Sequence, residues 1–485
     1  MNEIQELKPS LIWKYFDEIL AIPRPSKKEG KIITYLEKFA TDLNLSYKKD
    51  AIGNILITKP ATTGMENKKS VVFQSHVDMV CEKNSDVEHD FDNDPIQAYV
   101  DGDWLKAKGT TLGADNGIGV ATQLALLADT RIQHGPIECI FTVDEETGLT
   151  GANHLGNDFF ESNILINLDS EDEGEVYIGC AGGVDTLISY PLAIETVPAD
   201  IKTFQLEVKG LKGGHSGDDI DKGFGNSNKI INRVLWETNA KFGIYLHDFQ
   251  GGNLRNAIPR EAKAVFSTKP ENHEQVVELA KKLEKIIQQE LVHTEPNLAI
   301  NIIPTASPKK ALTKACLNRL LQSIYACPNG VLAMSHTIPG LVETSTNLAS
   351  VHFKDDEAEI VTSQRSSIET AKWDVSHAVK STFELIGAKV WNTDSYPGWT
   401  PNSDSEILKV SQESYKSLFG KEPAVKAIHA GLECGLFLEK YPQLDMISVG
   451  PTMRGVHSPD ERLNIPTVSL YWDFVVHILE NIPTK

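Results

Sequence analysis

Cysteine is scarce in this sequence, and its few copies are scattered. Six cysteines occur in 485 residues, and no two of them form a C-x-x-C pair. This pattern excludes the disulfide framework of small secreted proteins and a zinc site built from cysteine. Cys139 lies in the apolar run IECIFTV, where we expect it to be buried as a small hydrophobic side chain. We assign no function to any of the six.

Long apolar runs are also missing. No stretch approaches the roughly 18 apolar residues that a membrane-spanning helix needs. The segment from Met1 to Ile12 carries Glu3 and Glu6, and it lacks the basic start and apolar stretch of a signal peptide. We therefore expect a cytoplasmic protein that does not interact with membranes.

Positive charge is in the minority. Lys and Arg number 47 against 67 Asp and Glu, which gives a formal net charge of −20. Binding to nucleic acid requires a basic face, and no long Lys/Arg-rich tract is present, so we expect no nucleic-acid partner. The remaining composition, 41% hydrophobic and 24% charged, is typical of a globular protein. A chain of this length has room for two or three structural units.

The two ends of the chain share an α/β pattern that the middle does not. Up to residue 190, helical segments alternate with short apolar strands, among them Val71–Phe73, Ile137–Val143 and Ile164–Leu168. Residues 191–394 show alternating strands and amphipathic helices, which predict an inserted α+β domain. Residues 395–485 return to the first pattern, so we expect residues 1–190 and 395–485 to form one α/β domain together.

Acidic or histidine residues follow each of these three strands directly. The first strand leads into His76 and Asp78, the second into Glu145 and Glu146, and the third into Asp169. Ligands of open α/β sheets bind just beyond the carboxyl ends of the strands, so these residues are placed where a site is expected. Because residues two apart in a strand point the same way, the Asp78 carboxylate can hold the second imidazole nitrogen of His76.

Two more candidates lie in segments rich in glycine and proline. Asp115 occurs in GTTLGADNGIG before an expected helix, Ile118–Ala128, and His457 occurs in GPTMRGVHSPDE after the expected strand MISVG. Each candidate has a simpler explanation. Asp115 could cap the helix, adjacent glutamates such as Glu145 and Glu146 are usual in solvated loops, and an isolated histidine is common without any ligand.

The combination of side chains is more informative than any one of them. Mixed His and carboxylate ligands suit zinc, cobalt or manganese, and two neighbouring ions require a bridging carboxylate. A hydrolase with two metal ions also needs a carboxylate that is free to accept a proton from water. The adjacent residues Glu145 and Glu146 could supply the free carboxylate and a ligand.

Ten motifs spread over nearly the whole chain follow one family pattern. They are IPRPSKKEG, GNILITKPAT, QSHVDMV, KGTTLGADNGIG, DEETGLTGA, NLDSEDEGEVYIGCAGG, GLKGGHSGDDI, LRNAIPREA, HAGLECGLF and VGPTMRGVHSPDE. Through them the sequence resembles the clan of dinuclear zinc aminopeptidases and deacylases, and within it the aminoacyl-histidine dipeptidases of bacteria. The resemblance implies a catalytic domain with a mixed sheet flanked by helices, an inserted α+β domain at 191–394 that serves as a lid or for dimerisation, and a homodimer.

The resemblance also implies roles for residues of the first and last segments. It assigns His76 and Asp169 to one metal ion, Glu146 and His457 to the other, and Asp115 to both as the bridge. The implied cofactor is two Zn²⁺ per subunit, with Co²⁺ or Mn²⁺ as substitutes. Two neighbours of these ligands complete the set, since Glu145 resembles the general base and Asp78 the residue that orients His76.

Four further positions resemble those at which relatives contact substrate: His215, Asn256, Arg365 and Gly431. His215 matches a lid histidine that helps stabilise the oxyanion, and the resemblance leaves open whether it acts in its own subunit or in the partner's. Simpler explanations exist here too, because GHSG could be only a turn and Arg365 only a surface charge.

The expected activity is hydrolysis of unblocked dipeptides, including Xaa-His and carnosine-like substrates, by a hydroxide that bridges the metal ions. Closure of the inserted domain would limit substrate length. A deacylase or amidase of N-acyl amino acids would use the same metal site and is the alternative enzyme. A non-catalytic binding protein is the alternative from another class, and it would lack a ligand or the base, whereas all five ligand positions and Glu145 are present.

Overall fold

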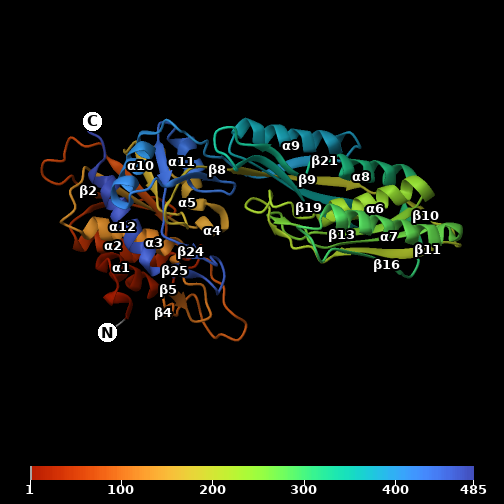
Figure 1. Ribbon diagram of the computed structural model, residues 1–485, viewed down its shortest axis with the longest axis horizontal. Helices are drawn as coiled ribbons and strands as arrows, with labels where there is room; N and C mark the ends of the chain where they lie inside the picture. Colours follow the sequence, from red (N-terminus) through yellow and green to blue (C-terminus); the bar gives the residue numbers. More distant parts are fainter. Residues whose placement is uncertain (1–2) are drawn as a thin grey trace. The chain divides into compact units, whose positions relative to one another are not determined.

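The computed structural model describes residues 3–485, which form two compact units (Figure 1). The first unit comprises Met1–Cys180, Trp399–Ala427 and Leu432–Lys485. The second comprises Ala181–Gly398 and Ile428–Gly431. The chain thus leaves the first unit at Ala181 and returns at Trp399, compared with the predicted changes at residues 191 and 395.

The first unit is built on an eight-stranded mixed sheet. Its order is β1 (Ser46–Lys49), β2 (Ile55–Lys59), β6 (Ile137–Thr142), β3 (Val71–His76), β7 (Ile164–Asn167), β23 (Asp445–Ser448), β8 (Glu175–Cys180) and β22 (Ala424–Ile428). Strands β6, β3, β7 and β23 are parallel neighbours, whereas β1, β2 and β8 pair antiparallel. Every residue of β3, β6 and β7 is buried, as expected for strands covered on both faces. Because β3 is parallel to both β6 and β7, the carboxyl ends of these three strands lie at the same end of the sheet.

Helices flank this sheet, and a small second sheet completes the unit (Figure 1). The helices are α1 (Ser10–Leu20), α2 (Gly30–Asp42), α3 (Ala114–Ala128), α4 (Glu145–Gly148), α5 (Thr150–His154), α10 (Glu406–Phe419), α11 (Cys434–Lys440) and α12 (Ile465–Glu480), after a short 3-10 helix at Glu3–Glu6. The second sheet has the order β24 (Met453–Arg454), β25 (Arg462–Asn464), β5 (Trp104–Ala107) and β4 (Ala98–Asp101). Helix α3 is almost wholly buried and contacts both α1 and β3.

The second unit is built on a nine-stranded sheet whose described pairs are antiparallel. Its order is β16 (Ala299–Pro304), β11 (Lys202–Lys209), β15 (Ala262–Thr268), β13 (Tyr245–Gly251), β19 (Val342–Lys354), β20 (Glu357–Ser366), β9 (Gly182–Pro191) and β21 (Lys389–Tyr396), with β18 (Gly330–Met334) paired to β19. Four helices lie along this sheet: α6 (Ser227–Phe242), α7 (His273–Glu290), α8 (Lys314–Ala326) and α9 (Glu369–Glu384). Two-stranded pairs join β10 (Ile194–Thr196) to β17 (Lys310–Leu312) and β12 (Gly214–His215) to β14 (Ala257–Ile258), and a 3-10 helix covers Pro270–Asn272.

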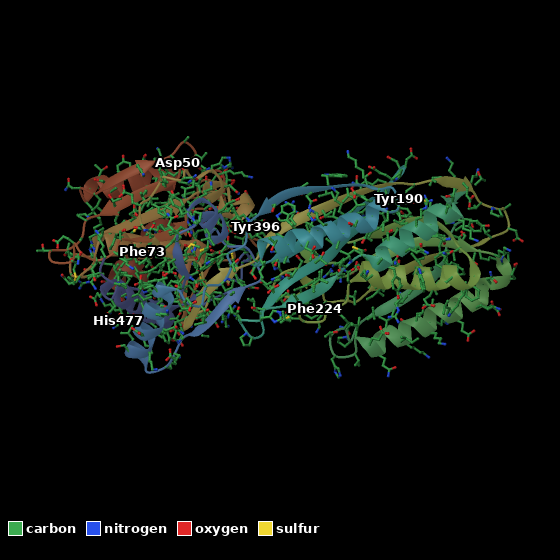
Figure 2. The ribbon with its side chains drawn as sticks, turned by 90° about the horizontal axis from the view of Figure 1, so that it is seen from above. Asp50, Phe73, Tyr190, Phe224, Tyr396 and His477 are labelled. Atoms are coloured by element: carbon green, nitrogen blue, oxygen red, sulfur yellow. The ribbon has the colours of Figure 1, made fainter. Side chains whose placement is uncertain are left out.

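Each unit buries its own apolar side chains. Phe73 on β3 lies within the first unit and is fully buried, whereas Tyr190 on β9 belongs to the core of the second (Figure 2). Cys139 is also fully buried, which confirms its predicted packing role. No helix within residues 3–485 combines the length and the apolar character needed to cross a bilayer. The predicted α/β class, with a mixed sheet flanked by helices and a separate α+β part, is confirmed.

Candidate metal centre

The site candidates of the first unit gather at the edge where the parallel strands end. His76 is the last residue of β3, Glu145 and Glu146 begin α4 shortly after β6, and Asp169 lies two residues beyond β7. Two ligand candidates from distant segments, in α3 and in the loop between β24 and β25, join them. The sheet thus brings together acidic and histidine side chains from five separate segments.

Asp115 lies between two histidines. Its Oδ1 is 3.1 Å from Nε2 of His76, and its Oδ2 is 3.2 Å from Nε2 of His457. Each histidine has a second carboxylate beside the same nitrogen, Asp169 Oδ1 at 3.5 Å from His76 and Glu146 Oε2 at 3.0 Å from His457. Two groups of ligand atoms result, and Asp115 belongs to both.

These residues fit a pair of divalent cations. Two imidazoles and three carboxylates form the donor set that suits zinc, cobalt or manganese. Within each group the candidate ligand atoms lie within 4.8 Å of one another. Oε1 of Glu146 is buried and has no hydrogen-bond partner among residues 3–485, and such an oxygen is satisfied by a bound cation.

The charges of this cluster perturb one another strongly. Burial, opposed by His76 and reinforced by Asp115, raises the pKa of the Asp169 carboxyl to about 7. Although burial disfavours a charged imidazole, the carboxylates of Asp169, Asp115 and Asp78 raise the pKa of His76 well above its usual value. Carboxylates crowded at this density repel one another, and divalent cations would offset that repulsion.

Asp78 connects His76 to the turn that carries both glutamates. Its Oδ1 lies 3.3 Å from Nδ1 of His76, and the same oxygen accepts a hydrogen bond of 3.0 Å from the Glu145 N–H. Its Oδ2 accepts hydrogen bonds from the Glu146 N–H at 3.2 Å and from the Ser26 hydroxyl at 2.8 Å. Asp78 is fully buried. Its single carboxylate links His76, at the end of β3, to the first two residues of α4.

Glu145 lies beside the cluster, with a carboxylate oxygen within 4.8 Å of candidate ligand atoms of His76 and Glu146. Burial raises the pKa of its carboxyl well above the usual value, and the carboxylates of Asp169, Glu146 and Glu433 add to the effect against the opposing charge of His76. A general base works best when its pKa approaches the working pH. The environment of Glu145 therefore suits proton transfer better than that of an exposed glutamate.

The substrate candidates lie in the second unit, close to one another. Nη2 of Arg365 is 3.5 Å from Nε2 of His215, and the carbonyl of Asn256 accepts a hydrogen bond of 2.8 Å from the residue after His215. A Cβ on Gly431 would lie 2.9 Å from the Tyr396 ring, whose hydroxyl accepts a hydrogen bond of 3.0 Å from Nη1 of Arg365. Arg365 is only 7% exposed, so the surface-charge explanation for it is wrong.

Two buried polar residues, one in each unit, had no role in the sequence prediction. His429 is buried with Nε2 at 2.7 Å from the Ser345 hydroxyl, and burial together with the Arg365 guanidinium lowers its pKa to about 3. In the first unit, Glu433 accepts hydrogen bonds from Gln74 at 2.5 Å and Thr142 at 2.7 Å. Both residues lie in the motif HAGLECG, so the motif held a signal beyond Gly431.

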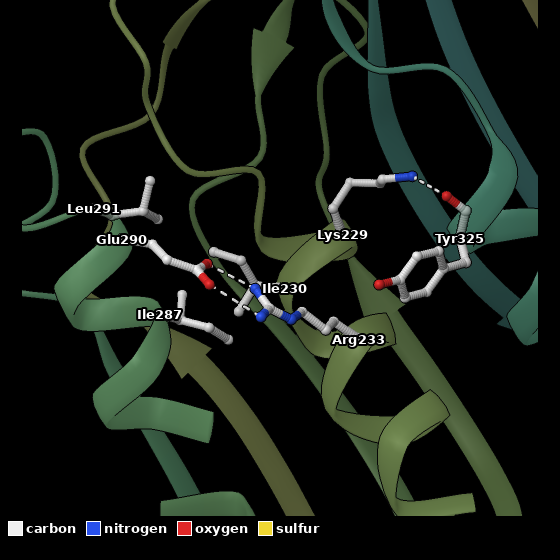
Figure 3. A pocket seen from close by; sticks show the side chains of 7 residues that line it. All are labelled: Lys229, Ile230, Arg233, Ile287, Glu290, Leu291 and Tyr325. Carbon is white, nitrogen blue, oxygen red and sulfur yellow. Dashed lines mark hydrogen bonds and ion pairs between the residues drawn. The ribbon is translucent and has the colours of Figure 1, made fainter. Parts of the chain in front are cut away.

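One cavity of about 260 Å³ lies elsewhere, in the second unit (Figure 3). The Arg233 guanidinium and the Glu290 carboxylate both line it and are hydrogen-bonded to each other at 2.7 and 3.0 Å. The Lys229 ammonium donates to backbone carbonyls, among them that of Tyr325 at 2.8 Å. The charged groups of this cavity already have partners, so it is a poor candidate for the functional site.

Comparison with known proteins gives matches over the full chain. The chain is 45% identical over 485 residues to the cytosol non-specific dipeptidase of Escherichia coli strain K12, with all of both chains covered. The crystal structure of the aminoacylhistidine dipeptidase from Vibrio alginolyticus matches with a TM-score of 0.93 and 45% identity, covering 100% of this chain and 99% of that one. An aminopeptidase PepT from Bacillus cereus ATCC 10987 shares the fold, with a TM-score of 0.58, 17% identity and coverage of 98% and 99%.

A family model supports the same assignment. The model of peptidase family M20/M25/M40 matches residues 72–481, which include every site candidate named above. The predicted resemblance and the prediction of a peptide-hydrolysing enzyme are thereby confirmed. The chain belongs to peptidase family M20/M25/M40.

Proposed function

We propose that this chain is a dipeptidase that uses two divalent metal ions to hydrolyse unblocked dipeptides, Xaa-His and carnosine-like substrates among them. The observation that carries the proposal is the position of Asp115 between His76 and His457, each with a second carboxylate beside it. The full-length similarity to proteins named as a non-specific dipeptidase and an aminoacylhistidine dipeptidase supports the choice of substrate.

In this proposal five side chains hold the cations. His76 and Asp169 would hold one ion, Glu146 and His457 would hold the other, and Asp115 would contribute to both sites. When bound, the cations would polarise the scissile carbonyl and lower the pKa of an attacking water molecule. Zn²⁺ is the proposed cofactor, and Co²⁺ or Mn²⁺ would suit the same donors.

Glu145 moves the proton in the proposed reaction. Its carboxylate accepts a proton as water attacks the peptide carbonyl, and it returns that proton to the leaving amine. Asp78 keeps the His76 imidazole in one orientation and holds the N–H groups of Glu145 and Glu146. The burial of Glu145, which favours the protonated form of its carboxyl, supports the role of proton carrier.

We propose further that four residues of the second unit, His215, Asn256, Arg365 and Gly431, contact the substrate. The Nε atom of Arg365 is buried and makes no hydrogen bond within residues 3–485. A guanidinium with an unused donor matches the free carboxylate that every unblocked dipeptide carries. His215 would help stabilise the oxyanion of the tetrahedral intermediate.

The assembly and location of the protein also belong to this proposal. We propose a homodimer in the cytoplasm, acting without a nucleic-acid or membrane partner. The name of the Escherichia coli relative, which places that protein in the cytosol, supports the location. The formal charge of −20 is consistent with the absence of a nucleic-acid partner.

A substrate comparison tests the proposed function. Protein loaded separately with Zn²⁺, Co²⁺ and Mn²⁺ would be assayed on an unblocked Xaa-His dipeptide, the matching tripeptide and an N-acetyl amino acid. We expect the dipeptide to have the highest kcat/KM. Preference for the N-acetyl amino acid would favour the deacylase, and no hydrolysis by protein that binds these metals would favour the binding protein.

A further inference from the structure

One buried carboxylate gathers the N–H groups at the start of α3. Oε2 of Glu461 accepts hydrogen bonds from the N–H groups of Leu112 at 2.7 Å and Gly113 at 3.0 Å. Oε1 accepts them from Ala114 at 2.8 Å and Asp115 at 3.3 Å. Glu461 is 2% exposed, so these charge-assisted bonds form away from solvent. Four consecutive backbone donors, ending at Asp115, therefore share one acceptor side chain.

This arrangement removes the helix-cap explanation of Asp115. Glu461 accepts hydrogen bonds from the N–H groups of Leu112 to Asp115, ahead of the regular helix that follows Asn116, and both carboxylate oxygens of Asp115 lie beside histidines. The backbone of Asp115 is non-helical, with φ −79° and ψ 117°. Its carboxylate is consequently free to face the two histidines.

Arg24, a buried positive charge, binds the segment before Asp115 from another side chain. Its guanidinium donates hydrogen bonds to the carbonyls of Val77 at 3.0 Å, Asp78 at 2.7 Å and Gly113. Arg24 is 2% exposed. The approach is close, because a Cβ on Gly113, whose φ is +69°, would lie 2.6 Å from Nη2 of Arg24. Arg24 therefore joins the segment that follows His76 to the segment that precedes Asp115.

Glu461 connects the segment before Asp115 to the segment that carries His457. It lies four positions after His457, and its N–H donates a hydrogen bond of 3.0 Å to the carbonyl of Ser458. The His457 side chain is 53% exposed, so packing alone does little to fix it. Two buried charges thus tie together the three segments that carry His76, Asp115 and His457.

We propose that Arg24 and Glu461 are positioning residues that set the Asp115 carboxylate between His76 and His457 before divalent cations bind. The inference rests on the proposed two-metal function. A bridging carboxylate must present one oxygen to each cation, so a small rotation of its segment removes it from one of them. Side chains that support metal ligands change metal affinity typically 10–100-fold when they are altered.

A matched control separates positioning from general stability. Glu138 lies in the same unit, at the amino end of β6 and therefore at the opposite end from His76. It is buried, and it also accepts backbone hydrogen bonds, from Glu161 at 3.1 Å and Ser162 at 2.8 Å. E138Q and E461Q each replace a buried acceptor oxygen by an amide group that faces N–H donors. Only E461Q should affect metal binding.

Co²⁺ titration tests the proposal. Wild type, E461Q, R24K and E138Q would be freed of metal, checked for folding by circular dichroism, and titrated with Co²⁺ by calorimetry and visible absorption. We expect wild type and E138Q to bind two Co²⁺ with the same spectrum. E461Q and R24K should lose about tenfold or more in affinity for at least one ion, with a changed spectrum.

The outcomes distinguish this inference from the proposed function. Wild-type affinity and spectrum in folded E461Q and R24K would overturn the positioning roles, as would an equal loss of affinity in E138Q. If E461Q does not fold, R24K decides alone. Failure of the wild-type protein to bind two Co²⁺ would instead overturn the two-metal function on which the inference rests.

Discussion

Oδ2 of Asp115 lies 3.2 Å from Nε2 of His457, although 342 positions separate the two residues in the chain. The other oxygen of the same carboxylate faces His76 at 3.1 Å. A carboxylate with one oxygen toward each histidine can bind two cations at once, which lets them act on one substrate. The proposed chemistry depends on this arrangement.

Replacing Asp115 by asparagine should remove the bridge. An amide has one weakly donating oxygen and no charge, so we expect the bound metal to fall from two ions per chain to one or fewer. The value of kcat/KM should fall by more than about 100-fold, the upper range for residues that only support ligands. Metal analysis and dipeptide kinetics measure both effects. D172N, at a nearby carboxylate paired with Arg454, should behave as wild type, and retention of both ions by D115N would contradict the bridging role.

Replacing Glu145 by glutamine should separate proton transfer from metal binding. An amide cannot accept the proton of the attacking water, so we expect kcat to fall by about 10²–10⁴-fold. Bound metal and KM should change little, because Glu145 is not one of the five proposed ligands. Steady-state kinetics and metal analysis of E145Q, with E161Q at an exposed glutamate as the control, test this assignment. Turnover at the wild-type rate by E145Q would remove Glu145 from the reaction.

Replacing Arg365 by alanine should weaken substrate binding. A hydrogen bond to a charged group contributes about 1.5–3 kcal/mol, so we expect KM for an unblocked dipeptide to rise about 10–100-fold. R233A is the matched control, because Arg233 lies in the same unit but pairs with Glu290 beside the cavity of Figure 3. Kinetics on a dipeptide and on its C-terminal amide measure the effect. An unchanged KM for the dipeptide would show that Arg365 does not bind the carboxylate.

The buried His429 should make the stability of the protein depend on pH. Its pKa is lowered to about 3 by burial and by the Arg365 charge, whereas an unfolded histidine titrates near 6.5. Between these values the unfolded chain binds one more proton at this position. The stabilising contribution is therefore fully present above pH 6.5, and it is lost at up to about 1.4 kcal/mol per pH unit as the pH falls toward 3.

Urea unfolding of wild type and H429Q from pH 7 to pH 4.5 isolates this contribution. The variant has no titrating side chain at position 429, so its free energy of unfolding should fall less steeply than that of wild type. The free energy of unfolding of wild type, relative to that of H429Q, should therefore decrease as the pH falls. Parallel curves for the two proteins over the whole range would show that His429 is not held neutral in the folded state.

The elements around the candidate metal ligands are predicted closely by the sequence. The apolar strands Ile137–Val143 and Ile164–Leu168 correspond to β6 (Ile137–Thr142) and β7 (Ile164–Asn167), because buried parallel strands are continuous apolar runs. The predicted helix Ile118–Ala128 lies within α3, which begins at Ala114, but Asp115 and Asn116 have non-helical backbone angles, so the regular helix starts only after Asn116, close to the predicted position. The rule that ligands gather beyond strand ends then selected His76 and Asp169 correctly as neighbours in space.

Buried charges were the part of the site that sequence patterns could not reveal. Arg24 and Glu461 look like ordinary solvated residues in their motifs, and their partners are mostly backbone groups of distant segments. Periodicity reports apolar faces and has no signal for a charge that is paired inside the fold. Periodicity likewise has no signal for buried polar side chains such as His429 and Glu433, although both lie in the motif HAGLECG together with Gly431.

Crystallographic location of the metal ions tests the central claim most directly. Crystals of the protein loaded with Zn²⁺ would be measured on both sides of the zinc absorption edge, so that anomalous differences reveal each ion. The account predicts two peaks, one among His76, Asp115 and Asp169 and the other among Asp115, Glu146 and His457. A single peak, or zinc bound away from Asp115, would contradict it.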